Sequence, residues 1–357
     1  MFDIRDGLTV QKMLKILELV NEGENNFINI SEKDLIIFIG GTQVGKSTTI
    51  NALLGVPLQE NDDGYIEPIP PNEFVAPVGD GRQNCTELPT LYEKEGFNFC
   101  FLDTQGFFEG RGEDLVIASS ILMEIAIRKA KSVRVVFLGK MSDLQGGYAE
   151  LTAKFSEQIS RIISNSTAPV FFLWNRYTPQ GKANILKFYN PNSSKDEQNK
   201  TIMNEIKTKM GTYIKDENAR INNIEKELEN KYDKINSSKN DKNQDKESLY
   251  NEILQVQKKN ILYSLVDNSY KHDYYGYIDP TNSDSILNFK KKIEECEAIS
   301  KCDLVYNQYS QEIVKFKDNF IKLLFDQFSF MKKQIFTGAY TKDIITFFEE
   351  SIKEQIK

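Results

Sequence analysis

The amino-acid sequence predicts an α/β fold built on a doubly wound, mostly parallel sheet. Short hydrophobic runs alternate with longer segments of helical periodicity, and strands separated by helices form parallel sheets. Glycine-rich or polar sequences directly follow three of these runs, at the carboxyl ends of the predicted strands, where this architecture binds ligands. A chain of 357 residues, 40% of them hydrophobic, can hold one large or two ordinary domains.

The predicted sheet begins after a short amphipathic helix. Apolar residues recur at helical spacing through residues 7–20, and the first buried strand covers residues 35–39. A helix at 47–54 follows it after a tight turn. The segment 57–89 is rich in proline and glycine and too long for an ordinary connection, so we expect it to be functional and mobile without its ligand.

The alternation continues through the middle of the chain. Hydrophobic runs predict strands, and apolar residues at three- and four-residue spacing predict helices. The predicted strands cover residues 90–93, 97–102, 133–138 and 170–174, and the predicted helices cover residues 115–131 and 148–163. Each of these helices separates two strands, as a parallel crossover requires.

Residues 40–47 carry the most informative motif, Gly-x-x-x-x-Gly-Lys-Ser, between a buried strand and a helix. This motif is typical of a phosphate-binding loop, called the P-loop below. Its glycines let the backbone wrap closely, so that N–H groups and the helix start face a phosphate. We expect Lys46 to reach the β- and γ-phosphates of a nucleotide and Ser47 to hold Mg²⁺. A glycine-rich turn without a ligand is the alternative. The residues predicted to bind nucleotide here are Gly40, Gly41, Thr42, Gln43, Val44, Gly45, Lys46, Ser47 and Thr48.

A second motif, Asp-Thr-Gln-Gly, starts at Asp103, directly after the predicted strand 97–102. An aspartate at the carboxyl end of a strand next to the P-loop strand holds Mg²⁺, usually through water. Asp-x-x-Gly alone is a common turn sequence, but its distance from the P-loop and its place at a strand end make it informative. Asp103 is therefore a predicted metal ligand.

With these motifs the chain resembles the translation-factor-related class of P-loop GTPases, and within it the septin, immunity-associated (GIMAP) and dynamin-like groups. The likeness rests on residues 40–55 and 103–107 and, more weakly, on residues 78–86; it covers about residues 30–180. It implies the P-loop GTPase fold, with GTP or GDP and Mg²⁺ as cofactors. It also implies that Gly106 places its N–H against the γ-phosphate, and that the chain forms a homodimer or homo-oligomer through its nucleotide face.

The resemblance implies further roles around the γ-phosphate. Thr86 ends the weaker match, where the family places a threonine that binds Mg²⁺ and senses this phosphate. Phe107 stands where many switch GTPases carry a water-positioning glutamine, and Gln105 lies earlier in the motif. Arg82 and Arg111 are candidates for an arginine supplied in cis or across a dimer, with solvated loop arginines as the simpler interpretation. Hydrolysis is therefore expected to be slow or to depend on assembly.

Base recognition departs from the family pattern after the predicted strand 170–174. The sequence Asn-Arg-Tyr-Thr from Asn175 stands where the family has Asn-Lys-x-Asp. Asn175 matches the family's asparagine, which pins the loop. The aliphatic part of the Arg176 side chain can cover one face of the base, as the family's lysine does. Thr178 replaces the carboxylate that accepts two hydrogen bonds from guanine, so discrimination should be weaker. ATP binding, relaxed specificity and a degenerate nucleotide site therefore stay open.

After residue 190 the sequence becomes charged and helical. Apolar residues at helical spacing through 201–235, a polar break at 237–246 and renewed helical spacing from Leu249 predict an antiparallel helical hairpin. A single exposed or partly disordered helix is the alternative. The run 261–266 resembles the last strand of the sheet, and residues 283–296 its closing helix.

These patterns divide the chain into three regions. We expect an amino-terminal helix and lead-in at 1–30, the P-loop GTPase domain at 31–296 with the hairpin inserted at about 195–260, and a helical extension at 297–357. An aromatic stripe in the extension is expected to pack against its own domain. Candidate surfaces for a protein partner are the helices at 200–260 and 303–357.

Composition excludes several classes of function. A net charge of −7 argues against a nucleic-acid backbone as the main partner. The sequence has no apolar stretch long enough to span a bilayer, and residues 1–6 are not expected to form a signal peptide. Membrane contact stays open, although nothing in the sequence indicates it. The four cysteines lack metal-ligand spacing and are expected to be reduced thiols of a cytoplasmic protein.

Three functions fit these observations. The first is a GTP-binding switch or assembly protein with weak hydrolysis. The second is an ATP-dependent P-loop kinase or ATPase, which only the missing carboxylate at position 178 favours. The third is a scaffold whose nucleotide site is vestigial, and the intact P-loop, Thr86 and Asp103 count against it.

Overall fold

The computed structural model describes residues 10–27, 30–63, 65–78, 88–94, 97–104, 113–140, 163, 167–175, 194–237, 243–300 and 304. The chain divides into two compact units, Glu18–Gln308 and Met1–Leu17 with Tyr309–Lys357. In the second unit the structure describes only residues 10–17, the first part of helix α1 (Val10–Glu24). The predicted carboxyl-terminal extension lies almost wholly outside the described residues.

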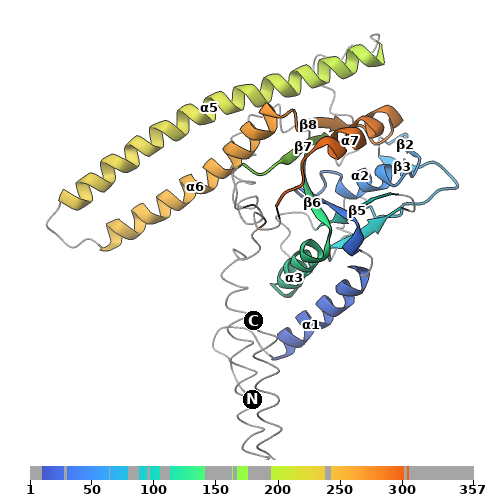
Figure 1. The fold of residues 1–357 in the computed structure, drawn as a ribbon, viewed down its shortest axis with the longest axis horizontal. Helices are drawn as coiled ribbons and strands as arrows, with labels where there is room; N and C mark the ends of the chain where they lie inside the picture. The colour runs from blue at the N-terminus through green and yellow to red at the C-terminus, as the bar shows by residue number, and fades with distance from the viewer. Residues whose placement is uncertain are drawn as a thin grey trace, which may run out of the picture. The chain divides into compact units, whose positions relative to one another are not determined.

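A mostly parallel sheet forms the centre of the larger unit (Figure 1). It has six strands in the order β4-β5-β1-β6-β7-β8. Its edge pair β4–β5 is antiparallel and its other pairs are parallel. The strands are β1 (Asp34–Ile39), β4 (Thr90–Glu93), β5 (Phe99–Asp103), β6 (Ser132–Lys140), β7 (Val170–Asn175) and β8 (Tyr275–Ile278). This confirms the predicted α/β fold with a mostly parallel sheet, and it places β1 between β5 and β6.

The segment 57–89 contains regular structure that the sequence did not predict. β2 (Leu58–Glu60) and β3 (Ile66–Pro68) pair antiparallel in a separate two-stranded sheet. Each strand is three residues long, which is too short for alternation of polar and apolar residues to indicate a strand. Residues 79–87 of this segment lie outside the described part of the chain.

Helices connect the parallel strands. Two 3-10 turns, η1 (Asn25–Phe27) and η2 (Ile30–Glu32), lead from α1 to β1. The helix predicted at 148–163 falls outside the described residues except for Ile163, which forms an antiparallel bridge with Leu304. No helix in the described part of the chain is both long and apolar enough to cross a bilayer. The helices of the larger unit that the structure describes are α2 (Lys46–Leu53), α3 (Glu113–Lys129), α5 (Lys195–Ser237), α6 (Asn243–Lys271) and α7 (Ser283–Glu295).

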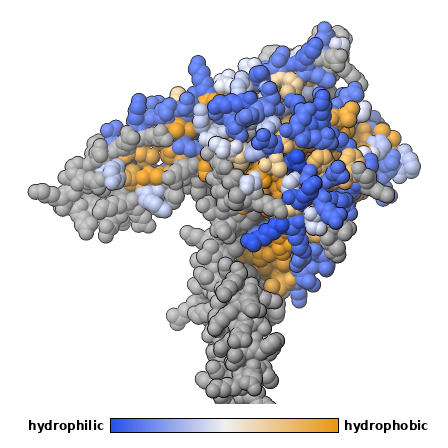
Figure 2. Space-filling view, viewed as in Figure 1, coloured by the Kyte–Doolittle hydropathy of each residue, from blue (hydrophilic) through white to orange (hydrophobic). Residues whose placement is uncertain are grey.

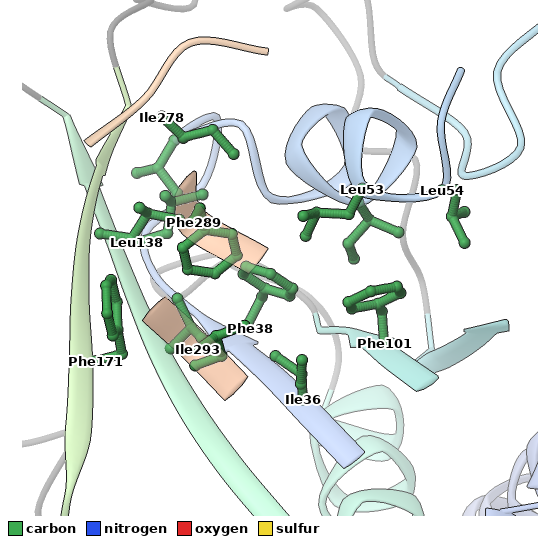
Figure 3. Packing of buried hydrophobic residues seen from close by; sticks show 14 of the residues in the cluster. Ile36, Phe38, Leu53, Leu54, Phe101, Leu138, Phe171, Ile278, Phe289 and Ile293 are labelled. Atoms are coloured by element: carbon green, nitrogen blue, oxygen red, sulfur yellow. The ribbon is translucent and has the colours of Figure 1, made fainter. Parts of the chain in front are cut away.

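Phe38 of β1 lies at the centre of the core on one face of the sheet (Figure 3). Its ring centroid is 6.4 Å from those of Phe101 on β5 and Phe289 on α7. The ring centroids of Phe289 and Phe171 on β7 are 5.4 Å apart. Leu53 of α2 belongs to the same cluster. The alternate residues of β1 are buried as well. A strand with both faces buried reads as a continuous apolar run, which is why β1 was easy to predict.

The last strand of the sheet is not where the sequence predicted it. Residues 261–266 belong to α6, and β8 is the strand that pairs with β7. Leu262, Leu265 and Val266 are buried at three- and four-residue spacing, which is the pattern of a helix. A short apolar run alone does not separate a buried strand from a buried helix. The closing helix α7 agrees with the prediction for 283–296.

α5 and α6 form an antiparallel hairpin between β7 and β8, as the sequence predicted (Figure 1). Lys207, early in α5, lies over the ring of Tyr270 at the end of α6, whereas Lys231 pairs with Glu252 nearer the start of α6. Hydrophobic residues gather along the line where the two helices face each other (Figure 2). Among the side chains of α5 that the structure describes, the buried hydrophobic ones are Ile206, Met210, Tyr213 and Ile221.

The base of this hairpin is hydrogen bonded to two strands of the sheet. Ser269 of α6 donates its hydroxyl to the carbonyl of Val170 on β7 at 2.6 Å. Tyr277 of β8 donates its hydroxyl to the side chain of Asn199 on α5. Both helices are therefore fixed to the sheet where they leave it.

Candidate functional site

Two positions in the tight loop between β1 and α2 accept only glycine. Gly45 has a φ of 93°, in the left-handed region, and a Cβ there would lie 2.1 Å from Nδ2 of Asn175. A Cβ at Gly40 would lie 2.3 Å from the carbonyl oxygen of Leu138 on β6. Both glycines of the motif are thus required by the local packing. Side chains at these positions would fill the space where the loop backbone passes its neighbours.

Lys46 opens α2, so the loop runs directly into a helix N-terminus. Its Nζ donates to the carbonyl oxygens of Gly40 at 3.3 Å and Gly41 at 3.1 Å, and the residue is buried. The ammonium group is thereby held against the loop beside the positive end of the helix dipole. Both features favour an anion at this place.

Ser47 and Asp103 meet at the carboxyl edge of the sheet. Ser47 Oγ donates to Asp103 Oδ2 at 2.6 Å, and Asp103 is fully buried. The contact arises because β5 pairs with β1 and sets Asp103 opposite Phe38. Thr104 Oγ1 donates to the carbonyl of Phe38 at 2.6 Å and holds the end of β5 in place. A hydroxyl and a carboxylate are hard oxygen donors, so this pair fits Mg²⁺.

The charge of Asp103 also acts on the neighbouring strand β4. Burial raises the pKa of Tyr92 to about 12, and the nearby Asp103 carboxylate adds to this shift. Tyr92 is therefore a neutral phenol at physiological pH. The same poorly solvated surroundings strengthen the attraction between Asp103 and any cation that reaches it.

Asn175 at the end of β7 holds the loop from the other side. Its Nδ2 donates to the carbonyl of Val44 at 2.8 Å, and the residue is buried. This is the contact expected of a residue that pins the loop. β7 pairs with β6, whose end lies beside β1. The sheet order therefore places Asn175 within reach of the loop.

The structure thus brings together the P-loop residues 40–48, Asp103 and Asn175. No group of three or more His, Cys, Asp and Glu side chains could hold a metal within the described ranges. Mg²⁺ at Ser47 and Asp103 would have to complete its shell with phosphate oxygens and water, as this ion commonly does. The predicted site residues outside the described part of the chain are Arg82, Thr86, Gln105, Gly106, Arg111, Arg176 and Thr178.

Two features of this region were missed from the sequence. Asn51 is fully buried on α2, and its place between the apolar residues Ile50 and Ala52 was the available signal. The misplaced last strand hid the turn after β8, where buried Asp279 accepts hydrogen bonds from the amide and hydroxyl of Thr281 at 3.1 and 2.7 Å. This turn lies at the same sheet edge as Asn175, because Asn175 and Ile278 are paired in register.

A pocket of about 510 Å³ lies at the carboxyl end of α2, whereas the loop precedes the amino end of this helix. Its lining comes from the end of α2, the β2–β3 region and α7, and includes Pro57, Ile69 and Lys290 but none of residues 40–48. Burial, followed by the charge of Lys94, lowers the pKa of Lys290. The residues that the sequence predicts to bind phosphate are therefore not part of this pocket.

No protein-family model matches the chain, and no curated protein matches its sequence. Among solved structures, the chain is similar to a dimerization-deficient mutant of Toc33 from Arabidopsis thaliana, with 12% sequence identity and a TM-score of 0.31. The match covers 57% of this chain and 70% of that one. So loose a likeness carries no argument about function. The fold class follows from the order and direction of the strands themselves.

Proposed function

We propose that this protein binds a guanine nucleotide with Mg²⁺ and acts as a nucleotide-controlled switch or assembly module. Its hydrolysis of GTP is slow or stimulated by assembly. The observation that carries the proposal is the meeting of Lys46, Ser47 and Asp103 around a glycine loop at the start of α2. Each of these groups has a matching partner in a Mg²⁺-bound triphosphate.

The residues of the loop divide the work of holding that ligand. Lys46 exchanges its contacts with the loop carbonyls for β- and γ-phosphate oxygens, and the loop backbone with the α2 N-terminus adds further donors. Ser47 and Asp103 hold Mg²⁺, which neutralises charge on the phosphates. Thr86 is proposed as a third Mg²⁺ ligand. Gln105, Gly106, Arg82 and Arg111 are the residues proposed for the γ-phosphate side.

The choice of base rests on the family resemblance. Asn175 fixes the loop to β7, and Arg176 and Thr178 follow at the end of that strand. Thr178 offers one neutral acceptor in place of a carboxylate, so GTP is preferred over ATP by a smaller margin than with the full motif. An ATP-binding P-loop enzyme is the second candidate, and the missing carboxylate is the feature that favours it.

The resemblance supports a homo-oligomer, and the cysteines without metal-ligand spacing support a cytoplasmic location. The protein forms a homodimer or homo-oligomer through the nucleotide face, and it works in the cytoplasm. The α5–α6 hairpin is a surface for a protein partner, because it extends between two strands of the sheet and carries exposed Tyr232 and Tyr250.

A titration of the purified protein with fluorescent GTP and ATP analogues in Mg²⁺ buffer tests this function. Lys46→Ala should weaken triphosphate binding at least about a hundredfold, because the variant loses charge-assisted hydrogen bonds to two phosphates. Competition with unlabelled GTP and ATP then measures the preference for the base. The expected order is GTP before ATP.

Lys33→Ala is the matched control. Lys33, like Lys46, has its ammonium group bound by oxygen atoms, here those of the Glu93 carboxylate, but it lies before the amino end of β1, at the opposite edge of the sheet. This variant should bind nucleotide like the wild type. Equal affinity in Lys46→Ala and wild type would rule out the P-loop as the binding site, and tighter binding of ATP would select the second candidate.

A further inference from the structure

The side chain of Asn51 connects α2 to a distant segment of the chain. Asn51 is fully buried and lies on α2 one turn after Ser47. Its Nδ2 donates to the carbonyl of Ser47 at 2.9 Å and to that of Ala76 at 2.7 Å. Its Oδ1 accepts from the amides of Val75 at 2.7 Å and Ala76 at 3.0 Å. One amide group thus makes four hydrogen bonds, two given and two received.

These bonds, rather than side-chain packing, fix the backbone at Val75. The Val75 residue is 56% exposed, so its side chain offers little packing to hold the chain there. Ala76 is fully buried, and both its amide and its carbonyl are bound by Asn51. Buried polar groups that lose such partners are costly, so the arrangement favours one discrete geometry.

The other end of the connection is Ser47, whose hydroxyl binds Asp103. The carbonyl of Ser47 and the backbone at 75–76 are held by the same amide group of Asn51. Any ligand that steadies the first turn of α2 therefore also steadies the hydrogen bonds to Val75 and Ala76. When local unfolding of the first turn of α2 is suppressed, local unfolding of the backbone at 75–76 is suppressed as well.

We propose that Asn51 is a positioning residue that couples nucleotide binding at the P-loop to the segment 69–78. This coupling rests on the proposed nucleotide binding. The coupling is reciprocal. If the nucleotide lowers the opening of Val75 and Ala76 by some factor, then opening of these residues lowers the affinity for the nucleotide by the same factor. Asn51 acts through Ser47 and the backbone of 75–76 and does not itself touch the ligand.

Hydrogen exchange measured by mass spectrometry on peptides spanning 69–78 tests the coupling. The full chain is compared with and without saturating Mg²⁺ and a non-hydrolysable GTP analogue, after a titration of each variant has established saturation. In the wild type the ligand should slow exchange of these peptides by about fivefold or more. In Asn51→Ala this slowing should disappear, although the ligand is bound.

Two further variants make the result specific. Asn72→Ala is the matched control, because Asn72 also donates a side-chain hydrogen bond to backbone in this segment, to the carbonyl of Ile69 at 2.6 Å, but makes no contact with Asn51 in the described structure. It should keep the wild-type slowing. Val75→Pro removes one of the two amides that bind Asn51 without changing α2, and should reduce the slowing at Ala76 at least about twofold.

The outcomes separate the coupling from the proposed function. Wild-type slowing retained in Asn51→Ala, or in Val75→Pro when Asn51→Ala does not fold, would overturn the role of Asn51. A wild type that binds the analogue without slower exchange at 69–78 would overturn it too. A wild type that fails to bind any nucleotide in the titration would instead refute the proposed function, and the coupling with it.

Discussion

At the scale of single residues, the loop at 40–47 was predictable because its chemistry and its geometry require the same residues at the same positions. Gly45 is required by a positive φ and by the approach of Asn175, and Gly40 by a carbonyl of β6. Such local constraints appear in a sequence as a fixed spacing. The role of Asn51 was not predictable, because its partners Val75 and Ala76 are 24 and 25 residues away and carry no motif.

The Ser47–Asp103 pair predicts how nucleotide binding depends on magnesium. Ser47→Ala and Asp103→Asn should lower nucleotide affinity at least about tenfold in Mg²⁺ buffer and much less in EDTA, because each removes an oxygen donor suited to the metal. Dissociation constants measured in both buffers give the ratio that checks this.

A second serine–aspartate pair serves as the control for that measurement. Ser132 donates to Asp34 at 2.8 Å, at the amino ends of β6 and β1 and away from the loop. Ser132→Ala should keep the wild-type ratio of affinities with and without Mg²⁺. Equal losses in both buffers for Ser47→Ala would contradict the assignment of these residues to the metal.

At the scale of elements, prediction succeeded where a second signal accompanied the apolar residues. The central strands β1, β5 and β7 are apolar runs that lead into Gly40, Asp103 and Asn175 of the recognised motifs, and α5 is long enough for its helical period to repeat many times. The strand placed at 261–266 was wrong, because six apolar-rich residues fit a strand as well as the buried face of α6. The true last strand, β8, has four residues and contains Gly276, so its signal is weak.

The helix α5 contains a glycine that limits its stability. A Cβ at Gly211 would lie 3.5 Å from the Tyr270 hydroxyl oxygen, an ordinary van der Waals contact. Gly211→Ala should therefore raise the free energy of unfolding by roughly 0.5–1 kcal/mol, because alanine loses less backbone entropy in a helix. Urea titrations followed by circular dichroism measure the change.

Gly45→Ala provides the opposite case in the same assay. Its φ of 93° and the 2.1 Å approach of Asn175 leave no room for a methyl group, so this variant should be less stable than the wild type. A Gly211→Ala protein that is no more stable than the wild type would show that α5 is not held as a continuous helix at this position.

At the scale of the whole molecule, several acidic groups are buried in their neutral form. Burial raises the pKa values of the Cys100 and Cys296 thiols to about 12, and that of Tyr92 also to about 12. Both cysteines are buried and free, as the expected reduced thiols would be. Folding therefore favours the protonated form of each group, and this contribution to stability is lost at alkaline pH.

The sign of this effect gives a test by pH. Unfolded thiols lose their protons near pH 9, whereas the folded ones keep them to about pH 12, so the free energy of unfolding should fall as pH rises from 9 to 12. Cys296→Ala removes one group and should make the fall shallower by up to about 1.4 kcal/mol per pH unit. Urea unfolding at pH 8, 9, 10 and 11 measures both slopes. Parallel curves for variant and wild type would contradict the buried-thiol account.

The rooted hairpin has a mechanical consequence. At about 1.5 Å per residue, the 43-residue α5 is about 65 Å long. Its base is fastened by short contacts, Ser269 to β7 and Tyr277 of β8 to Asn199. A sideways force applied far out on the hairpin acts on these hydrogen bonds through a lever arm as long as the helix, so the force at the base is larger than the force applied. β7 accepts one of these hydrogen bonds at Val170 and ends in Asn175, which binds the P-loop. A force far out on the hairpin would therefore exert a torque on the strand that holds the P-loop.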